Sequence, residues 1–149
     1  MTKVFGQTYE IVGVQIWRNV ASSFKNVATG DKEVNSSRFH YDNGNTGKER
    51  MSLNIFMYLN EVTDKNGPFT YYNPHQSKLI NRRFSLEILK YADLRQKQHT
   101  QRIESYIQPK KLLCPPGEAL LIDNQVCFHR AGYCEEGHRD ILEIVCRPT

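Results

Sequence analysis

The sequence predicts a mostly β domain of the jelly-roll type with one helical insertion, and three observations support this fold class. Much of the chain reads as short runs rich in β-branched and aromatic side chains. Glycine, proline, asparagine and aspartate separate these runs at intervals of roughly 8–12 residues, as turns do in β-sandwiches and barrels. One stretch has helical periodicity instead. No internal repeat is visible, which excludes solenoid folds.

The predicted strands follow one another along the chain in the pattern of an antiparallel sandwich or barrel. Residues 52–59 give the clearest signal, because apolar and other side chains alternate there with a period of two. A turn at 64–68 contains Asn66-Gly67-Pro68, and a second turn at 115–117 contains Pro115-Pro116-Gly117. The remaining strands are expected at 10–17, 38–42, 69–72, 118–123, 127–131 and 140–147.

The helical pattern runs from 85 to about 106, where Leu86, Leu89 and Leu94 fall on neighbouring turns. We therefore predict a helical insertion at about 80–108. The chain length fits one domain, so we expect residues 1–149 to form a single domain with its core at 38–148. Residues 79–109 would be a helical insertion or a lid over the mouth of the barrel.

The chain carries a formal charge of +4, and the excess is concentrated between Lys78 and Lys111. Such a segment is either a solvated helix face or a patch that attracts anions, which would suit an anionic substrate. An anion-binding or nucleic-acid-binding module is therefore an alternative. No recognised nucleic-acid motif accompanies the basic residues, so nucleic acid is the less favoured partner.

The sequence predicts a cytoplasmic protein that does not enter a membrane. No apolar run approaches the roughly 20 residues that cross a bilayer, and residues 1–5 do not begin a secretory signal. The four cysteines show no closely spaced pair, so we expect free thiols.

The first candidate for metal chemistry is His40-Tyr41-Asp42. On a strand, side chains at positions i and i+2 point to the same face, so an imidazole and a carboxylate converge there. Two histidines and one carboxylate are the ligands of a common type of non-haem iron site, and His40 and Asp42 would supply two of the three. Alone, the motif is short and not specific.

His129, on a late predicted strand, is the candidate for the third ligand, although a histidine beside Phe128 is more often a packed core residue. Arg139 follows ten positions later, at the start of the last predicted strand. Arginine is well suited to bind a carboxylate, because its planar fork makes two parallel charge-assisted hydrogen bonds.

The order H-x-D, then histidine, then arginine ten positions later resembles that of the 2-oxoglutarate and iron(II) dioxygenases. The sequence between these residues is most similar to the phytanoyl-CoA dioxygenase family. Three segments carry the likeness over most of 38–148. They are 55–62 with Asn66-Gly67-Pro68-Phe69, 73–78, and 116–123 with 129–132. The chain departs from that family in being short before His40, in having Phe56 where an active-site tryptophan is usual, and in lacking glycine at 73–78.

The resemblance implies a double-stranded β-helix, cupin-like in form, that uses Fe(II), 2-oxoglutarate as cosubstrate and dioxygen to hydroxylate a C–H bond of a small molecule. It implies that His40, Asp42 and His129 bind iron and that Arg139 binds the distal carboxylate of 2-oxoglutarate. Asn54, Phe56 and Tyr58 share one face of residues 52–59, and we expect that face to line the pocket. The other possibility is that Leu53, Ile55, Met57 and Leu59 face the interior.

Two further alternatives remain at this stage. Prolyl-hydroxylase-like relatives, which act on peptides, share the H-x-D motif, but they usually anchor the cosubstrate with lysine and have Gly-Gly where this chain has Asn66-Gly67. A metal-binding jelly roll without oxygenase activity is the other alternative, because a fold does not guarantee its chemistry.

Overall fold

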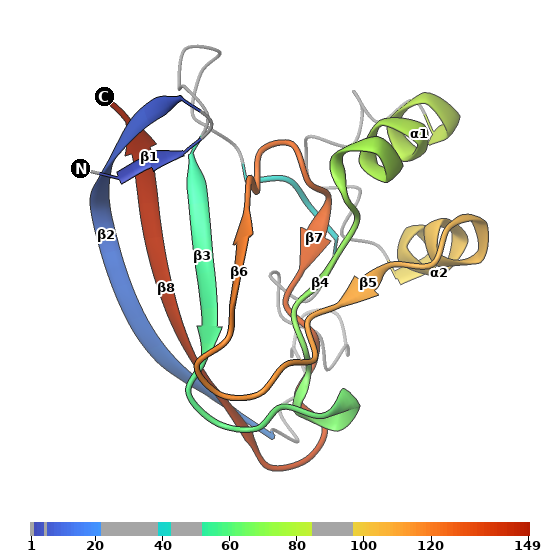
Figure 1. The fold of residues 1–149 in the computed structure, drawn as a ribbon. Helices are drawn as coiled ribbons and strands as arrows, with labels where there is room; N and C mark the ends of the chain where they lie inside the picture. Colours follow the sequence, from blue (N-terminus) through green and yellow to red (C-terminus); the bar gives the residue numbers. More distant parts are fainter. Residues whose placement is uncertain (1, 5, 22–38, 43–51, 85–96) are drawn as a thin grey trace, which may run out of the picture.

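The computed structural model describes residues 2–4, 6–21, 39–42, 52–84 and 97–149. Two antiparallel sheets and two helices make up the described part of the chain (Figure 1). The elements in order are β1 (Thr2–Val4), β2 (Gln7–Val20), β3 (Leu53–Tyr58), the 3-10 turn η2 (Asp64–Asn66), β4 (Thr70–Tyr71), α1 (Pro74–Phe84), α2 (Lys97–Tyr106), β5 (Lys110–Lys111), β6 (Ala119–Ile122), β7 (His129–Arg130) and β8 (His138–Pro148). The mostly β prediction is therefore confirmed.

The larger sheet has five strands in the order β1-β2-β8-β3-β6. Strand β8 lies between the two longest partners, pairing with β2 along one edge and β3 along the other. Its register sets Gln15, Glu143 and Phe56 in one row across three strands. Directly paired residues of antiparallel strands share a face, and Phe56 is buried. The three side chains of this row therefore lie on the inner face of the sheet.

The smaller sheet has the order β5-β4-β7, and its strands are only two residues long. Residues 39–42 extend it by one isolated bridge, from His40 to His129. The predicted strand at 38–42 is thus represented by this bridge, and residue 38 lies outside the described residues. The other predicted strands are all found, although several differ in length from their predicted bounds.

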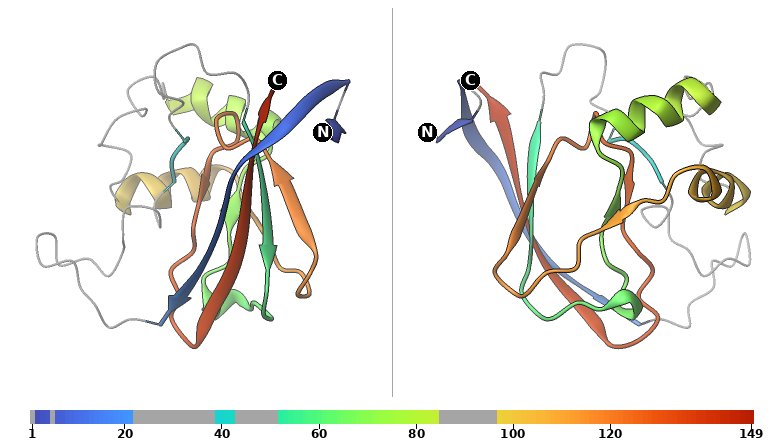
Figure 2. Two further views of the ribbon diagram at one scale, coloured as in Figure 1. Left: turned by 90° about the vertical axis from the view of Figure 1, so that its left-hand side faces the viewer. Right: turned by 45° about the vertical axis from the view of Figure 1, so that its right-hand side comes forward.

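The two sheets face each other, and the helices cover the far side of the smaller one (Figures 1 and 2). A core that includes Phe56, Tyr58, Phe69 and Ile141 lies between the sheets. A second core lies between the smaller sheet and the helices, and it consists of Phe39, Tyr72, Ile80, Ile103 and Phe128. The smaller sheet is therefore packed on both faces.

Helix α1 begins at Pro74, several residues before the predicted insertion. Asn73 accepts a hydrogen bond from the backbone N–H of Gln76, and the Gln76 side chain accepts one from the N–H of Asn73. This reciprocal cap, with proline at the first helical position, starts the helix there. The start predicted from leucine spacing was therefore late. Residues 85–96 of the predicted helix lie outside the described residues, and the lid role of 79–109 stays a prediction.

The outer face of the five-stranded sheet is apolar and exposed. Two cross-strand rows on that face are Val14–Ile144–Ile55–Leu121 and Ile16–Leu142–Met57–Ala119. No element within the described ranges covers these rows (Figure 1). Ile16 retains 67% of its exposure, so its side chain contributes little burial to this fold.

Gly67 and Gly132 lie backbone against backbone. Gly67 has φ +73, and a Cβ at either residue would lie less than 3 Å from backbone atoms at the other turn. The N–H of Gly132 donates to the carbonyl of Pro68. This contact joins the turn after η2 to the connection that follows β7.

None of the helices in the described part of the chain is long and apolar enough to cross a membrane. All four cysteines are free thiols, as expected from their spacing.

Removing the same atoms from a buried and an exposed isoleucine should give very different costs. Ile80→Ala on α1, where the side chain is fully buried, should lower the free energy of unfolding by about 2–5 kcal/mol. Ile16→Ala should cost about 1 kcal/mol or less, because its side chain is exposed. Denaturant unfolding of both variants measures the difference, and equal costs would contradict the described packing of α1.

Candidate metal centre

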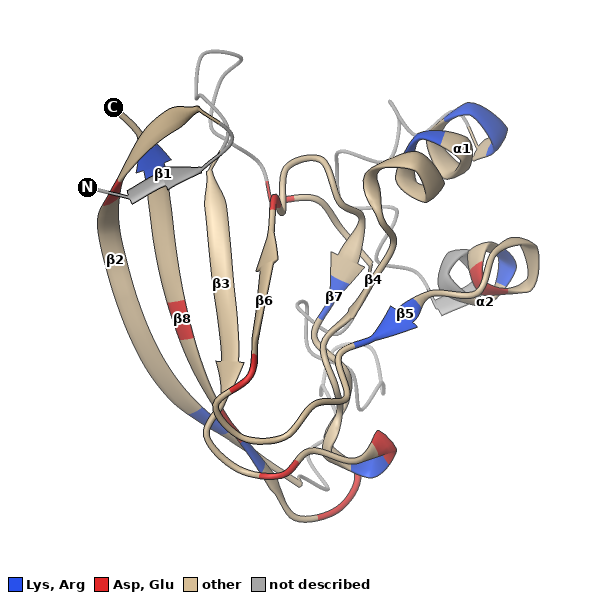
Figure 3. Cartoon of the chain, viewed as in Figure 1, with Lys and Arg blue, Asp and Glu red and all other residues tan. Residues whose placement is uncertain are grey.

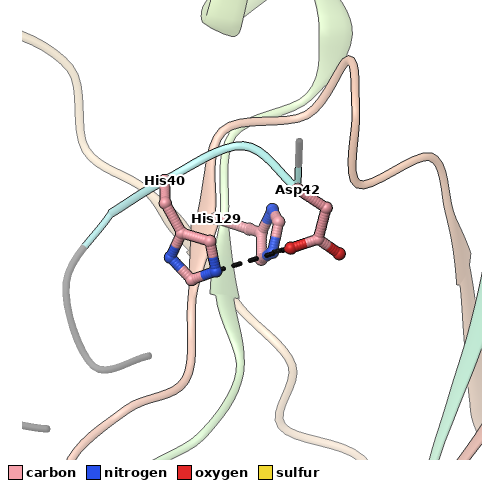
Figure 4. Close-up of side chains that lie close together, drawn as sticks. All are labelled: His40, Asp42 and His129. Carbon is pink, nitrogen blue, oxygen red and sulfur yellow. Dashed lines mark ion pairs between the residues drawn. The ribbon is translucent and has the colours of Figure 1, made fainter. Parts of the chain in front are cut away.

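Three side chains from two chain segments point toward one another between the sheets (Figure 4). His40 and Asp42 come from residues 39–42, and His129 comes from β7. One possible ligand atom from each lies within 4.8 Å of the other two. The predicted triad is therefore brought together.

Alternation along residues 39–42 produces this arrangement. Phe39 is buried in the core beneath the helices and Tyr41 packs against it, while His40 and Asp42 point the other way. The hydroxyl of Tyr41 donates to Asn81 on α1 at 2.9 Å, which ties the segment to the helix. The aromatic residues thus fix which face the two ligands occupy.

The His40–His129 bridge brings the second segment into place. Each residue donates its backbone N–H to the carbonyl of the other, at 2.8 and 3.0 Å. The two imidazole rings then lie 4.5 Å apart between centroids. The hydroxyl of Ser77, on α1, accepts a hydrogen bond from the N–H of Phe128, so the same helix also supports β7 beside His129.

The donor set fits a metal cation. Nε2 of His40 lies 3.6 Å and Nε2 of His129 lies 3.5 Å from Oδ1 of Asp42. Nδ1 of His129 lies 2.9 Å from the carbonyl oxygen of Cys127, to which it donates its proton. Nε2 therefore faces a carboxylate oxygen of Asp42, and a metal cation that displaces any proton from Nε2 would satisfy both atoms.

Asp42 is held in its charged form. Burial opposes its ionisation, but the hydrogen bond and charge of His129, the amide of Asn124 and the charge of His40 outweigh that effect and lower the pKa of Asp42. Asn124 is buried and donates from Nδ2 to Oδ2 of Asp42 at 3.0 Å. Its backbone carbonyl also accepts the N–H of Asp42. A carboxylate is the form that binds a metal.

Arg139 is buried on the inner face of β8, with only 3% of its surface exposed. Its Nε and Nη1 have no hydrogen-bond partner, and it forms no ion pair within the described ranges. Asn19, with its amide oxygen turned inward, accepts from Nη2 at 3.2 Å. Burial lowers the pKa of Arg139, and nearby Tyr58 and Cys134 oppose that shift. Unpaired guanidinium groups are costly to bury, so Arg139 is a candidate partner for an anion.

Asn54, Phe56 and Tyr58 are all buried, on the inner face of β3. The ring of Phe56 lies 4.5 Å from that of Phe69, which stacks on His129 at 5.4 Å. The N–H of Phe69 donates to the hydroxyl oxygen of Tyr58 at 2.7 Å. Their place in the interior agrees with the predicted pocket face, while their binding roles stay predictions.

Sequence reasoning missed Asn124 and Glu143. Asn124 contacts Asp42 across 82 positions of sequence, and nothing local to either residue indicates that pairing. Glu143 stands four positions after Arg139, so strand alternation from Arg139 would have placed it on the inner face. That signal was available.

Comparison with known proteins places the fold. No family model and no curated protein matches the chain. Among solved structures, HygX from Streptomyces hygroscopicus with iron bound aligns over 98% of this chain and 61% of its own, with a TM-score of 0.58 and 14% identity. HygX has also been solved with nickel and 2-oxoglutarate bound, and with hygromycin B in addition.

Two further structures are similar. ThoJ, a non-haem monooxygenase solved as a nickel complex, aligns over 96% of this chain and 46% of its own, with a TM-score of 0.53 and 13% identity. EvdMO1 aligns over 95% of this chain and 28% of its own, with a TM-score of 0.55 and 12% identity. At these identities the likeness shows a shared jelly-roll-like fold, and this chain spans less than two thirds of each structure.

Asn124→Ala should weaken metal binding without removing a ligand. Asp42 loses its side-chain hydrogen bond, and losses of this kind typically lower metal affinity by about 10- to 100-fold. Calorimetric titration with Ni(II) measures the change. Gln108→Ala is the control, because that amide bonds to the carbonyl of Glu104 on α2. Equal affinities in the two variants would show that Asn124 does not position Asp42.

Proposed function

We propose that this protein is a 2-oxoglutarate-dependent non-haem iron oxygenase that hydroxylates a C–H bond of a small molecule. One observation carries the proposal, namely the convergence of two imidazoles and one carboxylate on a single point between the sheets. Two histidines and one carboxylate on one side of a cation leave positions open for cosubstrate and dioxygen.

The order of the strands supports a double-stranded β-helix as the form of the fold. Along the chain, β2 lies in the larger sheet and residues 39–42 join the smaller one; β3 returns to the larger sheet, and β4 and β5 lie in the smaller. Strands β6, β7 and β8 then alternate between larger, smaller and larger. An antiparallel chain that alternates between two facing sheets in this way is a jelly roll. We propose that residues 1–149 form a single oxygenase domain with its core at 38–148.

The residues fit iron(II). His40 and His129 offer imidazole nitrogens, Asp42 offers a carboxylate oxygen, and the carbonyl of Cys127 holds His129 in the tautomer that binds through Nε2. When bound, iron and 2-oxoglutarate supply the oxidation of the substrate. The protein's task is to hold the ligands, to place the cosubstrate and to exclude competing anions and water.

Arg139 would hold the distal carboxylate of 2-oxoglutarate. Its Nε and Nη1 are unpartnered donors, and either can act together with the second N–H of Nη2 to make the paired hydrogen bonds that a carboxylate accepts. Burial raises the pKa of the nearby Tyr58 to about 12, so its hydroxyl stays protonated. Because its oxygen already accepts from Phe69, its O–H remains to donate to an anion beside Arg139.

Two motifs support the phytanoyl-CoA dioxygenase family over prolyl-hydroxylase-like relatives. The cosubstrate anchor would be arginine rather than lysine, and Asn66-Gly67 stands where the other branch has Gly-Gly. We therefore propose a small molecule rather than a peptide as substrate. The close approach of Gly67 to Gly132 explains why the second residue of the Asn-Gly motif is glycine, because a side chain there would clash with the backbone of Gly132.

The central test is anaerobic titration of the protein with Fe(II) and 2-oxoglutarate. We expect a weak visible charge-transfer band in the wild type and none in His129→Ala, which removes a ligand. His75→Ala is the matched control, because that histidine is exposed on α1. A metal-binding jelly roll without oxygenase activity, or an anion-binding module, predicts no such band and no succinate in air. Succinate formation by His129→Ala would refute its assignment.

Arg139→Lys should raise the KM for 2-oxoglutarate about tenfold or more, because a point charge cannot reproduce two parallel hydrogen bonds. Steady-state succinate formation at varied cosubstrate concentration measures the change. Arg18→Lys tests whether any arginine on this sheet has the same effect, because Arg18 forms an ion pair with Asp140 at the surface. An unchanged KM in Arg139→Lys would argue against the cosubstrate assignment.

A further inference from the structure

Glu143 is an interior carboxylate that the proposed iron and cosubstrate sites do not use. It lies on β8 in the row that contains Phe56, on the same inner face as Arg139 and Ile141. That face looks across the core toward the smaller sheet, which carries the triad. The side chain is therefore directed into the space between the sheets.

Glu143 is held in place by Asn54. The Nδ2 group of Asn54, itself 4% exposed, donates to Oε1 of Glu143 in a short hydrogen bond. Its other oxygen, Oε2, accepts no hydrogen bond from a residue in the described ranges, and no basic side chain there forms an ion pair with the carboxylate. One oxygen is thus fixed and the other is available to a ligand.

The charges of the triad also influence the pKa of Glu143. Burial raises the pKa of Glu143; the hydrogen bond from Asn54 opposes this shift, the negative charge of Asp42 adds to it, and His129 opposes it. Glu143 does not belong to the group of atoms within 4.8 Å that defines the metal centre. Asp42 and His129 therefore act on Glu143 electrostatically, while Glu143 itself is not one of the three candidate metal ligands.

The inner face of β8 is therefore polarised. Arg139 is cationic, while Glu143, four residues further, is a carboxylate in the field of Asp42. Four strand residues span about 13 Å, which exceeds the length of a five-carbon diacid. A cosubstrate dianion at Arg139 leaves the Glu143 end unneutralised, and an anionic substrate there would face two carboxylates.

We propose, on the basis of the oxygenase function above, that Glu143, positioned by Asn54, binds the substrate, and that the substrate carries a protonated amine. A charge-assisted hydrogen bond from the ammonium to Oε2 would hold the molecule beside the metal centre. Glu143 thereby determines specificity and takes no part in holding the metal.

This proposal reverses the substrate charge expected from the basic residues between 78 and 111. Those in the described ranges lie on α1, α2 and β5 (Figure 3). Both helices pack on the outer side of the smaller sheet. Lys111 pairs with Asp64, and Arg102 lies over the ring of Phe84. The charges on α1 and α2 are therefore directed away from the space that contains Glu143, whereas Lys110 on β5 shares a cross-strand row with Tyr71 and His129.

The test uses the protein loaded with Ni(II) and 2-oxoglutarate. Ligand-observed NMR and calorimetry measure the binding of matched fragments that carry a primary amine, a hydroxyl or a carboxylate on the same carbon skeleton. Amines should bind the wild type better than their neutral and anionic counterparts. Glu143→Gln should weaken amine binding by about 10- to 100-fold and remove the preference, because the charged acceptor is lost. Glu136→Gln, at a surface pair with Lys65, should keep it.

The metal separates this proposal from the function on which it rests. The charge-transfer band with Fe(II) and 2-oxoglutarate should be the same in wild type and Glu143→Gln. Absence of the band in the wild type overturns both proposals. A band in both proteins without any amine preference in the wild type, or with a preference that survives in Glu143→Gln, overturns only the substrate assignment. A band lost in Glu143→Gln assigns the residue to the metal centre instead and also overturns it.

Discussion

The site depends on the two reciprocal backbone hydrogen bonds between His40 and His129. They set residues 39–42 beside β7 in one register, and strand alternation then determines where every other side chain of the segment points. A shift of one residue would send both His40 and Asp42 toward the helices and bring aromatic rings between the sheets. Burial of Phe39 and Phe128 beneath α1 and α2 opposes that shift. Packing of the aromatic residues against the helices therefore determines that His40 and Asp42 point to the opposite face of the smaller sheet.

The two sheets contribute different chemistry to the space they enclose. The smaller sheet and the adjoining residues 39–42 supply two imidazoles and Asp42, supported by helices on its outer face. The larger sheet supplies the isolated charges Arg139 and Glu143, which lie on one strand and are held by partners on β2 and β3. Separate sheets allow the charges to be varied without disturbing the backbone contacts that assemble the triad. This separation suits a fold that hosts many substrates.

Much of the fold was predictable because its signals are local. Period-two alternation at 52–59 and the H-x-D motif each depend only on neighbouring residues. The helix start at Pro74 depended on the reciprocal cap of Asn73 and Gln76, which leucine spacing does not register. Asn124 was beyond reach, because its contact with Asp42 exists only once distant segments meet. The triad itself was predicted through the order of motifs, since no single motif was specific.

The close approach of Gly67 and Gly132 makes two turns depend on each other's lack of a side chain. Neither glycine touches the triad, so their requirement is steric and independent of any ligand. A descendant that lost His129 would still need both glycines to keep its turns together. The glycine pair therefore belongs to the fold, whereas the H-x-D motif belongs to the proposed metal site. A chain that kept the pair and lost the motif would be expected to keep the fold without that site.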